Sequence, residues 1–426
     1  MKYYFKTSGK SYVFDGNKVA VFLKGTEIER VNSLRHFLPI DTDVRTDYLK
    51  TVCLILNNSC NLCCDYCYAH GGTYNLPSQK MSLRVAKQAI DMTARSVLQH
   101  NDNKITIAFF GGEPLLNFNL IQKIVNYVKE YYKNLSAKYQ ITTNGTLITK
   151  SIAKFLERNN FDIMLSIDGN KKLHDFYRKY KNGIGTFDDI IENLHNIKNK
   201  KLINARITIT NINPNINDYI DDILKLGIRR ITFAADYFIN SVALKKYVQS
   251  LKLLIKKYEK DIKSGYLYDI TNLTKVICSI VLHTRYRTHC NAGISYLTVS
   301  PEGNYYRCPR FVGNKDFYMG KINKIEEVTR NMENFKNILG RNASNRNSGC
   351  AKCHFVNLCG GMCYHHANFL QKDQFAIAPK ECLQRKTIYK WVLRLICNLS
   401  VTERRNLLHF LMGLWKNFTE EDYGGN

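Results

Sequence analysis

The sequence lacks the long apolar runs of a membrane protein. No uninterrupted apolar stretch approaches the roughly 18 residues needed to span a bilayer. The nearest candidate, residues 388–399, is broken by Lys390 and Arg394. Residues 1–10 contain no apolar segment of the kind found in secretion signals. These absences predict a cytoplasmic protein without a membrane partner.

Acidic residues are also scarce. The chain has 36 Asp and Glu against 62 Lys and Arg, which gives a formal net charge of +26. Such a charge can attract nucleic acid or an acidic peptide. However, the basic residues are scattered along the chain, and no nucleic-acid-binding module is recognisable. We therefore predict no nucleic-acid partner. The excess of charge indicates an acidic partner or, more simply, a lysine-rich composition.

Cysteine, in contrast, is abundant, with 14 residues. Without a visible export signal, metal ligation is a better explanation of these cysteines than disulfides. Cys60, Cys64 and Cys67 follow an apolar run in the segment CNLCCDYC. A four-iron cluster takes four thiolates, so three would leave one iron open. The alternative is a zinc site built from two CxxC pairs, Cys60/Cys63 and Cys64/Cys67. Because Cys63 and Cys64 are consecutive, their Cα atoms are only about 3.8 Å apart, and wrapping both pairs around one tetrahedral ion would be strained.

The CxxxCxxC spacing, with the aromatic Tyr66 before the last cysteine, resembles the radical S-adenosylmethionine (SAM) superfamily. The resemblance implies that the open iron binds SAM. It also implies that an injected electron splits SAM to give a 5′-deoxyadenosyl radical, which requires an electron donor such as flavodoxin or ferredoxin.

Residues 51–235 alternate short β-rich runs with amphipathic segments. The predicted strands are Thr51–Asn57, Lys104–Phe110, Tyr139–Thr143, Asp162–Ser166, Asn204–Ile209 and Arg230–Ala234, with helices near 82–98, 117–133, 149–159, 186–199 and 216–226. Serial β/α units predict an α/β fold with a parallel sheet and right-handed crossovers. The resemblance implies a partial (β/α)6 TIM-like barrel, whose active site lies at the carboxyl ends of the strands.

Three motifs fall at predicted strand ends: GGEP at 111–114, TTNGT at 142–146 and SIDG at 166–169. By resemblance, Glu113 holds the methionyl amino group, while Ser166 and Arg178 bind the carboxylate and ribose region of SAM. An arginine can direct two donors onto one carboxylate, so its chemistry suits that role. The full set of predicted SAM contacts is Tyr66, Gly112, Glu113, Asn144, Ser166 and Arg178.

Three further residues of the barrel and one of the linker have alternative interpretations. His174 and Asp175 are predicted either to hold a loop or to act in the site. Arg206 is predicted either to face the cofactor or to form an ion pair within the barrel. Cys278 lies in an apolar run and is most simply a core thiol.

A second group of cysteines lies between residues 290 and 382, in a pattern similar to the SPASM extension of this superfamily. A zinc ribbon would use four of these seven cysteines and leave three idle. By resemblance, one auxiliary [4Fe–4S] cluster has the ligands Cys350, Cys353, Cys359 and Cys382, and the other has Cys290, Cys308 and Cys363. The fourth coordination position of the second cluster has four possible states. It is vacant, or it is occupied by His289, by Cys278 or by the substrate. The resemblance thus implies three [4Fe–4S] clusters and a small, loop-rich iron–sulfur domain.

The residue after Cys308 separates two kinds of relative. Sulfatase maturases carry an Asp there as a base, whereas this chain has Pro309, and the segment CPRFVGNKDFYMG resembles peptide maturases. The resemblance therefore implies a precursor peptide as partner, with a possibly acidic leader, and a Cys thioether crosslink as product. A carbon–carbon crosslink, formylglycine formation by a sulfatase-maturase-like enzyme, and a non-catalytic zinc or RNA-binding protein are the alternatives.

The predicted organisation has five parts. Residues 1–50 hold a β-hairpin between Tyr12 and Phe22 that caps the barrel or captures substrate, and 51–235 form the radical SAM core. A helical linker spans 236–288, the SPASM domain 289–385, and a helical C-terminal tail 386–426.

Overall fold

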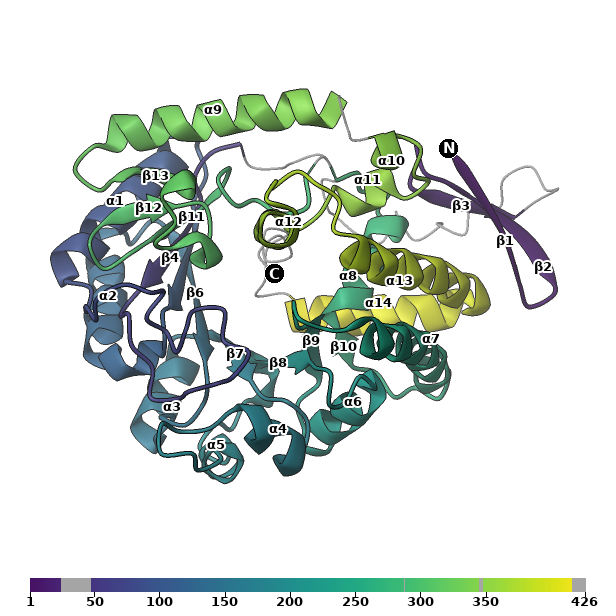
Figure 1. Cartoon of the computed structure of the whole chain (residues 1–426), viewed down its shortest axis with the longest axis horizontal. Helices are drawn as coiled ribbons and strands as arrows, with labels where there is room; N and C mark the ends of the chain where they lie inside the picture. Colours follow the sequence, from purple (N-terminus) through teal and green to yellow (C-terminus); the bar gives the residue numbers. More distant parts are fainter. Residues whose placement is uncertain (24–46, 287, 345–347, 416–426) are drawn as a thin grey trace.

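A long, largely parallel sheet organises the molecule (Figure 1). The computed structural model describes residues 1–23, 47–286, 288–344 and 348–415. Within these residues the sheet has ten strands: β4 (Thr51–Ile55), β5 (Lys104–Phe110), β6 (Ser136–Thr143), β7 (Asp162–Ser166), β8 (Ile203–Ile209), β9 (Arg230–Ala235), β10 (Asp269–Ile270), β11 (Tyr296–Val299), β12 (Asn304–Tyr306) and β13 (Tyr318–Lys321). Their spatial order is β10-β9-β8-β7-β6-β5-β4-β11-β12-β13.

The predicted α/β core is confirmed. Strands β4 to β9 are the six predicted strands, and each pairs in parallel with the next. The helices between them are α1 (Leu83–Gln99), α2 (Phe118–Tyr131), α3 (Lys150–Arg158), α4 (Lys171–Tyr177), α5 (Phe187–Leu194) and α6 (Ile216–Lys225). In Figure 1 these helices lie on the outside of the curved sheet. Strands β4 and β5 are nearly continuous apolar runs, whereas β6, β7 and β8 alternate buried residues with less buried ones.

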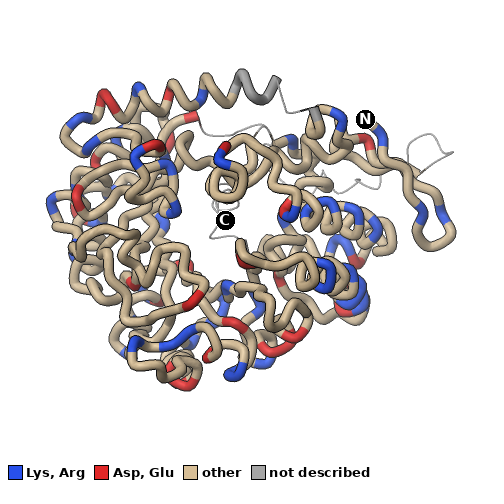
Figure 2. Tube along the Cα trace, viewed as in Figure 1, with Lys and Arg blue, Asp and Glu red and all other residues tan. Residues whose placement is uncertain are grey.

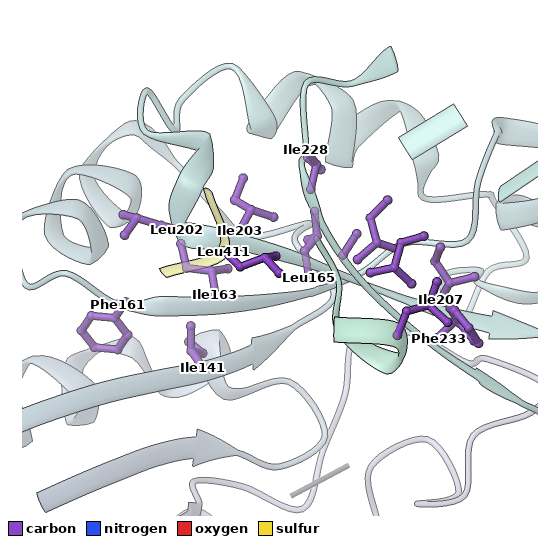
Figure 3. Close-up of a cluster of buried hydrophobic side chains, with 14 of the residues drawn as sticks. Ile141, Phe161, Ile163, Leu165, Leu202, Ile203, Ile207, Ile228, Phe233 and Leu411 are labelled. Carbon is purple, nitrogen blue, oxygen red and sulfur yellow. The ribbon is translucent and has the colours of Figure 1, made fainter. Parts of the chain in front are cut away.

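Aromatic side chains fill the space between the sheet and the outer helices. Phe161 is fully buried, and its ring lies 5.7 Å from that of Phe109 and 5.3 Å from that of Tyr139. Figure 3 shows Phe161 beside Ile141 and Ile163, from the neighbouring strands β6 and β7. This packing fixes the strands whose carboxyl ends carry the predicted motifs.

The C-terminal half continues the same sheet. After the linker helices α7 (Ser241–Lys263) and α8 (Thr271–Val281), strand β11 pairs in parallel with β4, and β12 and β13 add antiparallel strands. The remaining helices are α9 (Ile325–Ser344), α10 (Ser348–Ala351), α11 (Val356–Cys359), α12 (Tyr364–Gln371), α13 (Pro379–Asn398) and α14 (Val401–Trp415). Helix α13 runs without a break through the predicted boundary at 385/386, and residues 416–426 of the predicted tail lie outside the described residues.

The N-terminal hairpin belongs to a separate three-stranded sheet. Strand β2 (Lys10–Asp15) pairs with β3 (Ala20–Leu23), as predicted, and β1 (Lys2–Thr7) adds a third strand that the sequence pattern did not indicate. Tyr3 and Phe14 pack on Phe355, with ring centroids 5.3 and 5.7 Å apart. The sheet therefore lies on the outer side of the C-terminal half (Figure 1). Residues 24–46 of the predicted cap lie outside the described residues. No described helix is long and apolar enough to cross a membrane.

Candidate active site

A cavity of about 740 Å³ lies against the carboxyl ends of the barrel strands. Its wall includes residues that directly follow β5, β6 and β9, the cysteine loop after β4, residues around β11 and the segment that follows Cys308. All six predicted SAM contacts line it: Tyr66, Gly112, Glu113, Asn144, Ser166 and Arg178. The structure therefore brings together residues that the chain separates by more than a hundred positions.

Cys60, Cys64 and Cys67 share one wall of this cavity. The backbone N–H of Leu62 donates to Cys60 Sγ at 3.4 Å, and the N–H of Cys67 donates to the Cys64 carbonyl at 3.0 Å, so the loop folds back on itself. Burial, reinforced by the neighbouring thiols, raises the pKa of Cys60 to about 12 and that of Cys64 to about 11. The three thiols are thus close neighbours. Cys63, in contrast, is exposed and is not part of the cavity wall.

The GGEP loop holds this cysteine loop in place. Backbone N–H groups of Gly112 and Glu113 donate to the carbonyls of Asn57 and Ser59 at 3.2 and 3.0 Å. The contact is so close that a Cβ on Gly112 would lie 2.1 Å from the Ser59 carbonyl oxygen. Only glycine fits there.

Glu113 is buried, with 1% of its surface exposed. Its carboxylate accepts hydrogen bonds from Thr143 Oγ1 at 2.7 Å and from the backbone N–H groups of Asn144 and Leu115 at 2.8 and 3.1 Å. Burial nevertheless raises its pKa to about 7. A bound ammonium group would supply the positive charge that favours the ionised form of this carboxylate.

Tyr66, Asp168 and Arg178 form a polar cluster beside the cysteines. Arg178 Nη1 donates to the Tyr66 hydroxyl at 2.8 Å, and that hydroxyl donates to Asp168 Oδ2. Arg178 Nε is buried without a hydrogen-bond partner among the described residues. A buried donor costs free energy unless it is paired, so this atom fits a ligand carboxylate or ribose oxygen.

His174 and Asp175 hold the loop that carries Arg178. His174 Nδ1 accepts from the Asp168 N–H at 3.2 Å, and Asp175 Oδ1 accepts from the N–H groups of Thr186 and Phe187 at 2.8 and 2.9 Å. Their role is therefore structural. Arg206 lines the cavity, and no described carboxylate lies within 4 Å of its guanidinium, so the interpretation of Arg206 as one half of a barrel ion pair was wrong.

A second cysteine group faces the same cavity. Cys290, Cys308 and Cys363 all line it. Burial and the neighbouring thiols raise the pKa of Cys290 to about 11 and that of Cys308 to about 12. Of the candidates for a fourth ligand, His289 also lines the cavity, but both of its ring nitrogens lie within 2.9 Å of the Arg385 guanidinium. Cys278 packs against the hydrophobic core and is not part of the cavity wall.

The remaining predicted ligands form a third group outside the cavity: Cys350, Cys353, Cys359 and Cys382. Cys382, in the first turn of α13, lies close enough to Cys353 and Cys359 for their charges to raise its pKa, although burial is the main cause. The backbone N–H of Cys353 donates to the Cys350 carbonyl at 3.0 Å, and Arg385 Nη1 lies 3.9 Å from Cys359 Sγ.

The chemistry of these groups suits iron–sulfur clusters. Thiolates are the ligands that such clusters take. Among the described residues, no three His, Cys, Asp or Glu side chains converge closely enough to hold a single metal ion. Four thiolates around one zinc would lie about 3.8 Å apart at a Zn–S distance of about 2.3 Å. No group of cysteines among the described residues has that arrangement.

Residues 54–227 match the family described as the Radical SAM superfamily. The chain carries a radical SAM domain. Such a domain implies a SAM-binding [4Fe–4S] cluster, and the relatives of the chain include enzymes that modify peptides or proteins. The prediction of a radical SAM enzyme is therefore confirmed, and the alternative of a non-catalytic zinc or RNA-binding protein is wrong.

Three relatives show how far the similarity extends. An uncharacterised protein of Methanocaldococcus jannaschii is 37% identical over 44% of this chain and 63% of its own length, less than two thirds. The radical SAM cyclopropyl synthase TigE of Paramaledivibacter caminithermalis is 25% identical over 80% of this chain and 74% of its own. A cysteine-type anaerobic sulfatase-maturating enzyme of Clostridium novyi is 29% identical over 72% and 85%.

Two solved structures share the fold. The enzyme anSMEcpe with bound AdoMet superposes with a TM-score of 0.71 at 23% identity, over 85% of this chain and 99% of that one. Streptococcus suis SuiB bound to its precursor peptide SuiA has a TM-score of 0.52 at 15% identity, over 78% and 75%. At these identities the likeness concerns the fold, and it includes the region beyond the radical SAM domain.

A polar cluster that the sequence pattern did not indicate lies between the radical SAM cysteines and the second cysteine group. The Arg310 guanidinium lies 5.3 Å from the Tyr68 ring and 5.4 Å from the Tyr237 ring, and it donates to the Tyr237 hydroxyl. That hydroxyl also lies 3.1 Å from His365 Nδ1. One signal was available: Tyr68, Arg310 and His365 each lie within two residues of a predicted cysteine ligand.

Proposed function

We propose that the chain is a peptide maturase that cleaves SAM reductively and installs a Cys thioether crosslink in a ribosomally made precursor peptide. The observation that carries this proposal is the shared cavity. Its wall includes both the radical SAM cysteines and Cys290, Cys308 and Cys363. A peptide in this space would contact both groups at once, which a crosslinking reaction requires.

The proposal assigns three clusters. Cys60, Cys64 and Cys67 hold the SAM-binding cluster. Auxiliary cluster I takes Cys290, Cys308 and Cys363, and auxiliary cluster II takes Cys350, Cys353, Cys359 and Cys382. With three protein thiolates, cluster I has room for a substrate thiolate, the kind of ligand that iron–sulfur centres prefer.

The crosslink removes two hydrogens from the peptide. SAM and the clusters, held by the cysteines assigned above, would supply the oxidising chemistry: one carbon-bound hydrogen would be taken up as an atom, and the thiol hydrogen would leave as a proton while its electron is accepted by a cluster. The electron that cleaves SAM comes from a low-potential donor such as flavodoxin or ferredoxin. The sulfur–carbon bond then replaces one S–H and one C–H bond.

The residues of the chain position the reactants. Glu113 accepts the SAM ammonium group, and the free Nε of Arg178 donates to the carboxylate or ribose. Tyr66 holds Arg178 and Asp168 in register with the cysteine loop. Arg310 and Tyr237 close the wall between the two cysteine groups, so that a side chain entering there is shielded from water.

The second candidate function is formylglycine formation, because a cysteine-type sulfatase-maturating enzyme is among the relatives. That reaction needs a base beside the substrate. In this chain the residue after Cys308 is Pro309, which starts a 3₁₀ turn, and the next side chain is Arg310. Neither can accept a proton at neutral pH. We therefore place the crosslinking function first.

The proposal is tested by anaerobic reconstitution followed by reduction with dithionite. About twelve irons per chain are expected from three four-iron clusters, together with release of 5′-deoxyadenosine. Cys64→Ala should abolish this release. Cys63→Ala is the matched control, since Cys63 is adjacent, exposed and outside the cavity wall, and it should leave the rate unchanged. Equal rates for the two variants would contradict the assignment.

The product is identified by mass spectrometry of a Cys-containing precursor peptide encoded beside the gene. A thioether predicts loss of two hydrogens and of one thiol that reacts with iodoacetamide. Loss of two hydrogens with every thiol still reactive would indicate a carbon–carbon crosslink instead. An aldehyde in place of the cysteine side chain would indicate formylglycine.

A further inference from the structure

Two of the four arginines that line the catalytic cavity lack an acidic partner among the described residues. The four are Arg178, Arg206, Arg230 and Arg310. An aspartate carboxylate lies 4.0 Å from Arg178, and another lies 3.0 Å from Arg230. Within the described part of the chain, no carboxylate lies within 4 Å of the guanidinium of Arg206 or of Arg310. These two side chains therefore bring positive charge into the cavity that no nearby carboxylate balances.

Arg206 extends from the inner face of β8. In the parallel sheet it is paired with Ser166 of β7 and with Thr232 of β9, and all three line the cavity. Side chains alternate along a strand, and Asn204 and Thr208, two positions away in either direction, line the cavity as well. None of these four neighbours carries a charge. The register of the sheet thus places the Arg206 guanidinium among neutral side chains.

Arg310 reaches the same region from the C-terminal half of the chain. Its guanidinium donates to the hydroxyl of Tyr237, which follows β9. Burial, and after it the positive charge of Arg310, lowers the pKa of Arg206 to about 10, so the two guanidiniums are close neighbours. Two like charges repel each other, and a buried cation without a counter-ion costs free energy. An anion bound between Arg206 and Arg310 would remove both penalties.

Arg310 alone has a simpler explanation, because it lies two residues after Cys308 and can balance the charge of a cluster held there. That explanation does not extend to Arg206, whose paired neighbours on the sheet are neutral. Asp168 is the acidic group that acts on the pKa of Arg206, but its carboxylate already accepts from the Tyr66 hydroxyl and from the Thr208 N–H. A ligand from outside the chain accounts better for the charge of Arg206.

The carboxylate of SAM is one candidate for that ligand, since Ser166 is paired with Arg206. Arg178 already offers SAM a buried Nε that has no hydrogen-bond partner among the described residues. Arg310, in contrast, belongs to the polar cluster with Tyr68 and Tyr237. That cluster lies between the two cysteine groups of the cavity, where a peptide would enter. A carboxylate of the peptide therefore suits the pair better.

We propose that Arg206 and Arg310 form an anion subsite that binds a carboxylate of the precursor peptide. The carboxylate belongs to an Asp or Glu side chain or to the C-terminus, which present the same chemistry. Two guanidiniums direct several N–H donors onto its oxygens. A neutral amide in its place would leave both cations unpaired, so the subsite selects for charge. This inference rests on the proposed function, because it takes the substrate to be a peptide.

The test compares variants of Arg206 with a matched surface variant. Arg206→Gln removes the charge, Arg206→Lys keeps it, and Arg84→Gln removes one charge from an exposed position of α1. Each Gln variant lowers the formal net charge by one, from +26 to +25. The surface control is needed because Figure 2 shows Lys and Arg all around the periphery of the molecule. Every protein is reconstituted and loaded with SAM, and its iron content and thermal unfolding are measured.

The probes are three radiolabelled tripeptides without cysteine, so none can bind a cluster through a thiolate. Acetyl-Gly-Glu-Gly-amide has a side-chain carboxylate, acetyl-Gly-Gln-Gly has only the terminal one, and acetyl-Gly-Gln-Gly-amide has neither. Equilibrium dialysis at constant ionic strength gives each Kd. The unmodified protein and Arg84→Gln should bind one charged tripeptide at least about tenfold more tightly than the neutral one. Arg206→Gln should reduce this preference to within about twofold, and Arg206→Lys should keep part of it.

The charged tripeptide that binds more tightly identifies the source of the carboxylate, and either result supports the subsite. Equal affinities of all three tripeptides for the unmodified protein would overturn the proposal. A full preference in Arg206→Gln would place the carboxylate elsewhere on this basic protein and would overturn it too. The Kd of SAM should change by less than about twofold in Arg206→Gln. A large rise in that Kd with an unchanged peptide preference would assign Arg206 to the SAM carboxylate instead.

Arg310→Gln tests the second guanidinium in the same way and should lose the preference while it keeps its iron. Loss of iron would assign Arg310 to the cluster, and a full preference would remove it from the subsite; both results contradict the proposal. The tripeptides are not turned over, so the comparison does not depend on crosslinking. If the unmodified enzyme shows the preference and forms no thioether, the proposed function fails and the subsite stands.

Discussion

Replacing Gly112 with alanine tests the contact that joins the GGEP loop to the cysteine loop. The added Cβ would lie 2.1 Å from the Ser59 carbonyl oxygen, 2.4 Å from the Ser59 carbonyl carbon and 2.9 Å from the backbone nitrogen of Cys60. All three are backbone atoms, so no side-chain rotation relieves the overlap. Non-bonded atoms pack at about 3.5 Å, and the cysteine loop must therefore retreat by about 1 Å.

That displacement has two consequences. The Ser59 carbonyl also accepts the Glu113 N–H at 3.0 Å, so the movement weakens this hydrogen bond. Overpacking and a weakened bond together lower the free energy of unfolding by about 2 to 4 kcal/mol. In catalysis, a misplacement of about 1 Å at a reacting group can cost about a hundredfold in rate. We expect Gly112→Ala to form 5′-deoxyadenosine at least about a hundredfold more slowly with dithionite.

The assay is the rate of 5′-deoxyadenosine formation, measured with iron content and thermal unfolding on the same preparation. The cysteines of the two proposed auxiliary clusters lie on other segments, so at least about eight irons per chain should remain. Gly413→Ala is the control, because a Cβ there meets no atom within 4 Å, and alanine in a helix is favoured over glycine by about 0.5 to 1 kcal/mol. A Gly112→Ala enzyme within about threefold of the unmodified rate would refute the steric argument.

Three further predictions follow from the site and the core. Burial raises the pKa of Glu113 to about 7, so its carboxyl group becomes protonated below that pH and no longer attracts the SAM ammonium group. The Kd of SAM, measured by equilibrium dialysis, should therefore rise about tenfold from pH 8 to pH 6. A Kd that does not change with pH would contradict this. Cys308→Ala and Cys359→Ala should each leave about eight irons per chain, and the double variant about four; a double variant that keeps eight would place both cysteines on one cluster. Phe161→Ala should lower the free energy of unfolding by about 3 to 5 kcal/mol, as judged by urea denaturation, whereas the exposed Phe176→Ala should change it little; similar losses would contradict the packing described.

The barrel was predictable because its sequence signal is local. Strands such as Thr51–Ile55 are buried along their whole length, so they read as unbroken apolar runs between amphipathic helices. The motifs were predictable for a related reason. Each lies at the carboxyl end of a strand, and in a parallel sheet these ends meet at one edge. The place of each motif at the end of a predicted strand was therefore enough to predict that it lies in the site.

Structure that depends on distant segments was not predictable in this way. Strand β10 has two residues and exists because Asp269 and Ile270 pair with β9. Strand β1 exists because β2 offers it a partner and Phe355 packs against its face. The Arg310 and Tyr237 contact joins residues 73 positions apart. No pattern within either segment indicates it, since the partner is chosen by the fold.

The cysteines of the C-terminal half show how one local feature can decide a global assignment. Cys359 and Cys363 are four residues apart and would be neighbours on a single helix. Instead, α11 ends at Cys359, and Gly360 and Gly361 follow with φ angles of +67° and +112°. A Cβ on Gly360 would lie 2.4 Å from the Thr288 carbonyl oxygen, so the turn is pressed against the segment that leads to Cys290. The turn directs Cys363 to the cavity with Cys290 and leaves Cys359 beside Arg385 and away from it. The two glycines thus separate consecutive cysteines into two groups, one that lines the cavity and one that lies outside it.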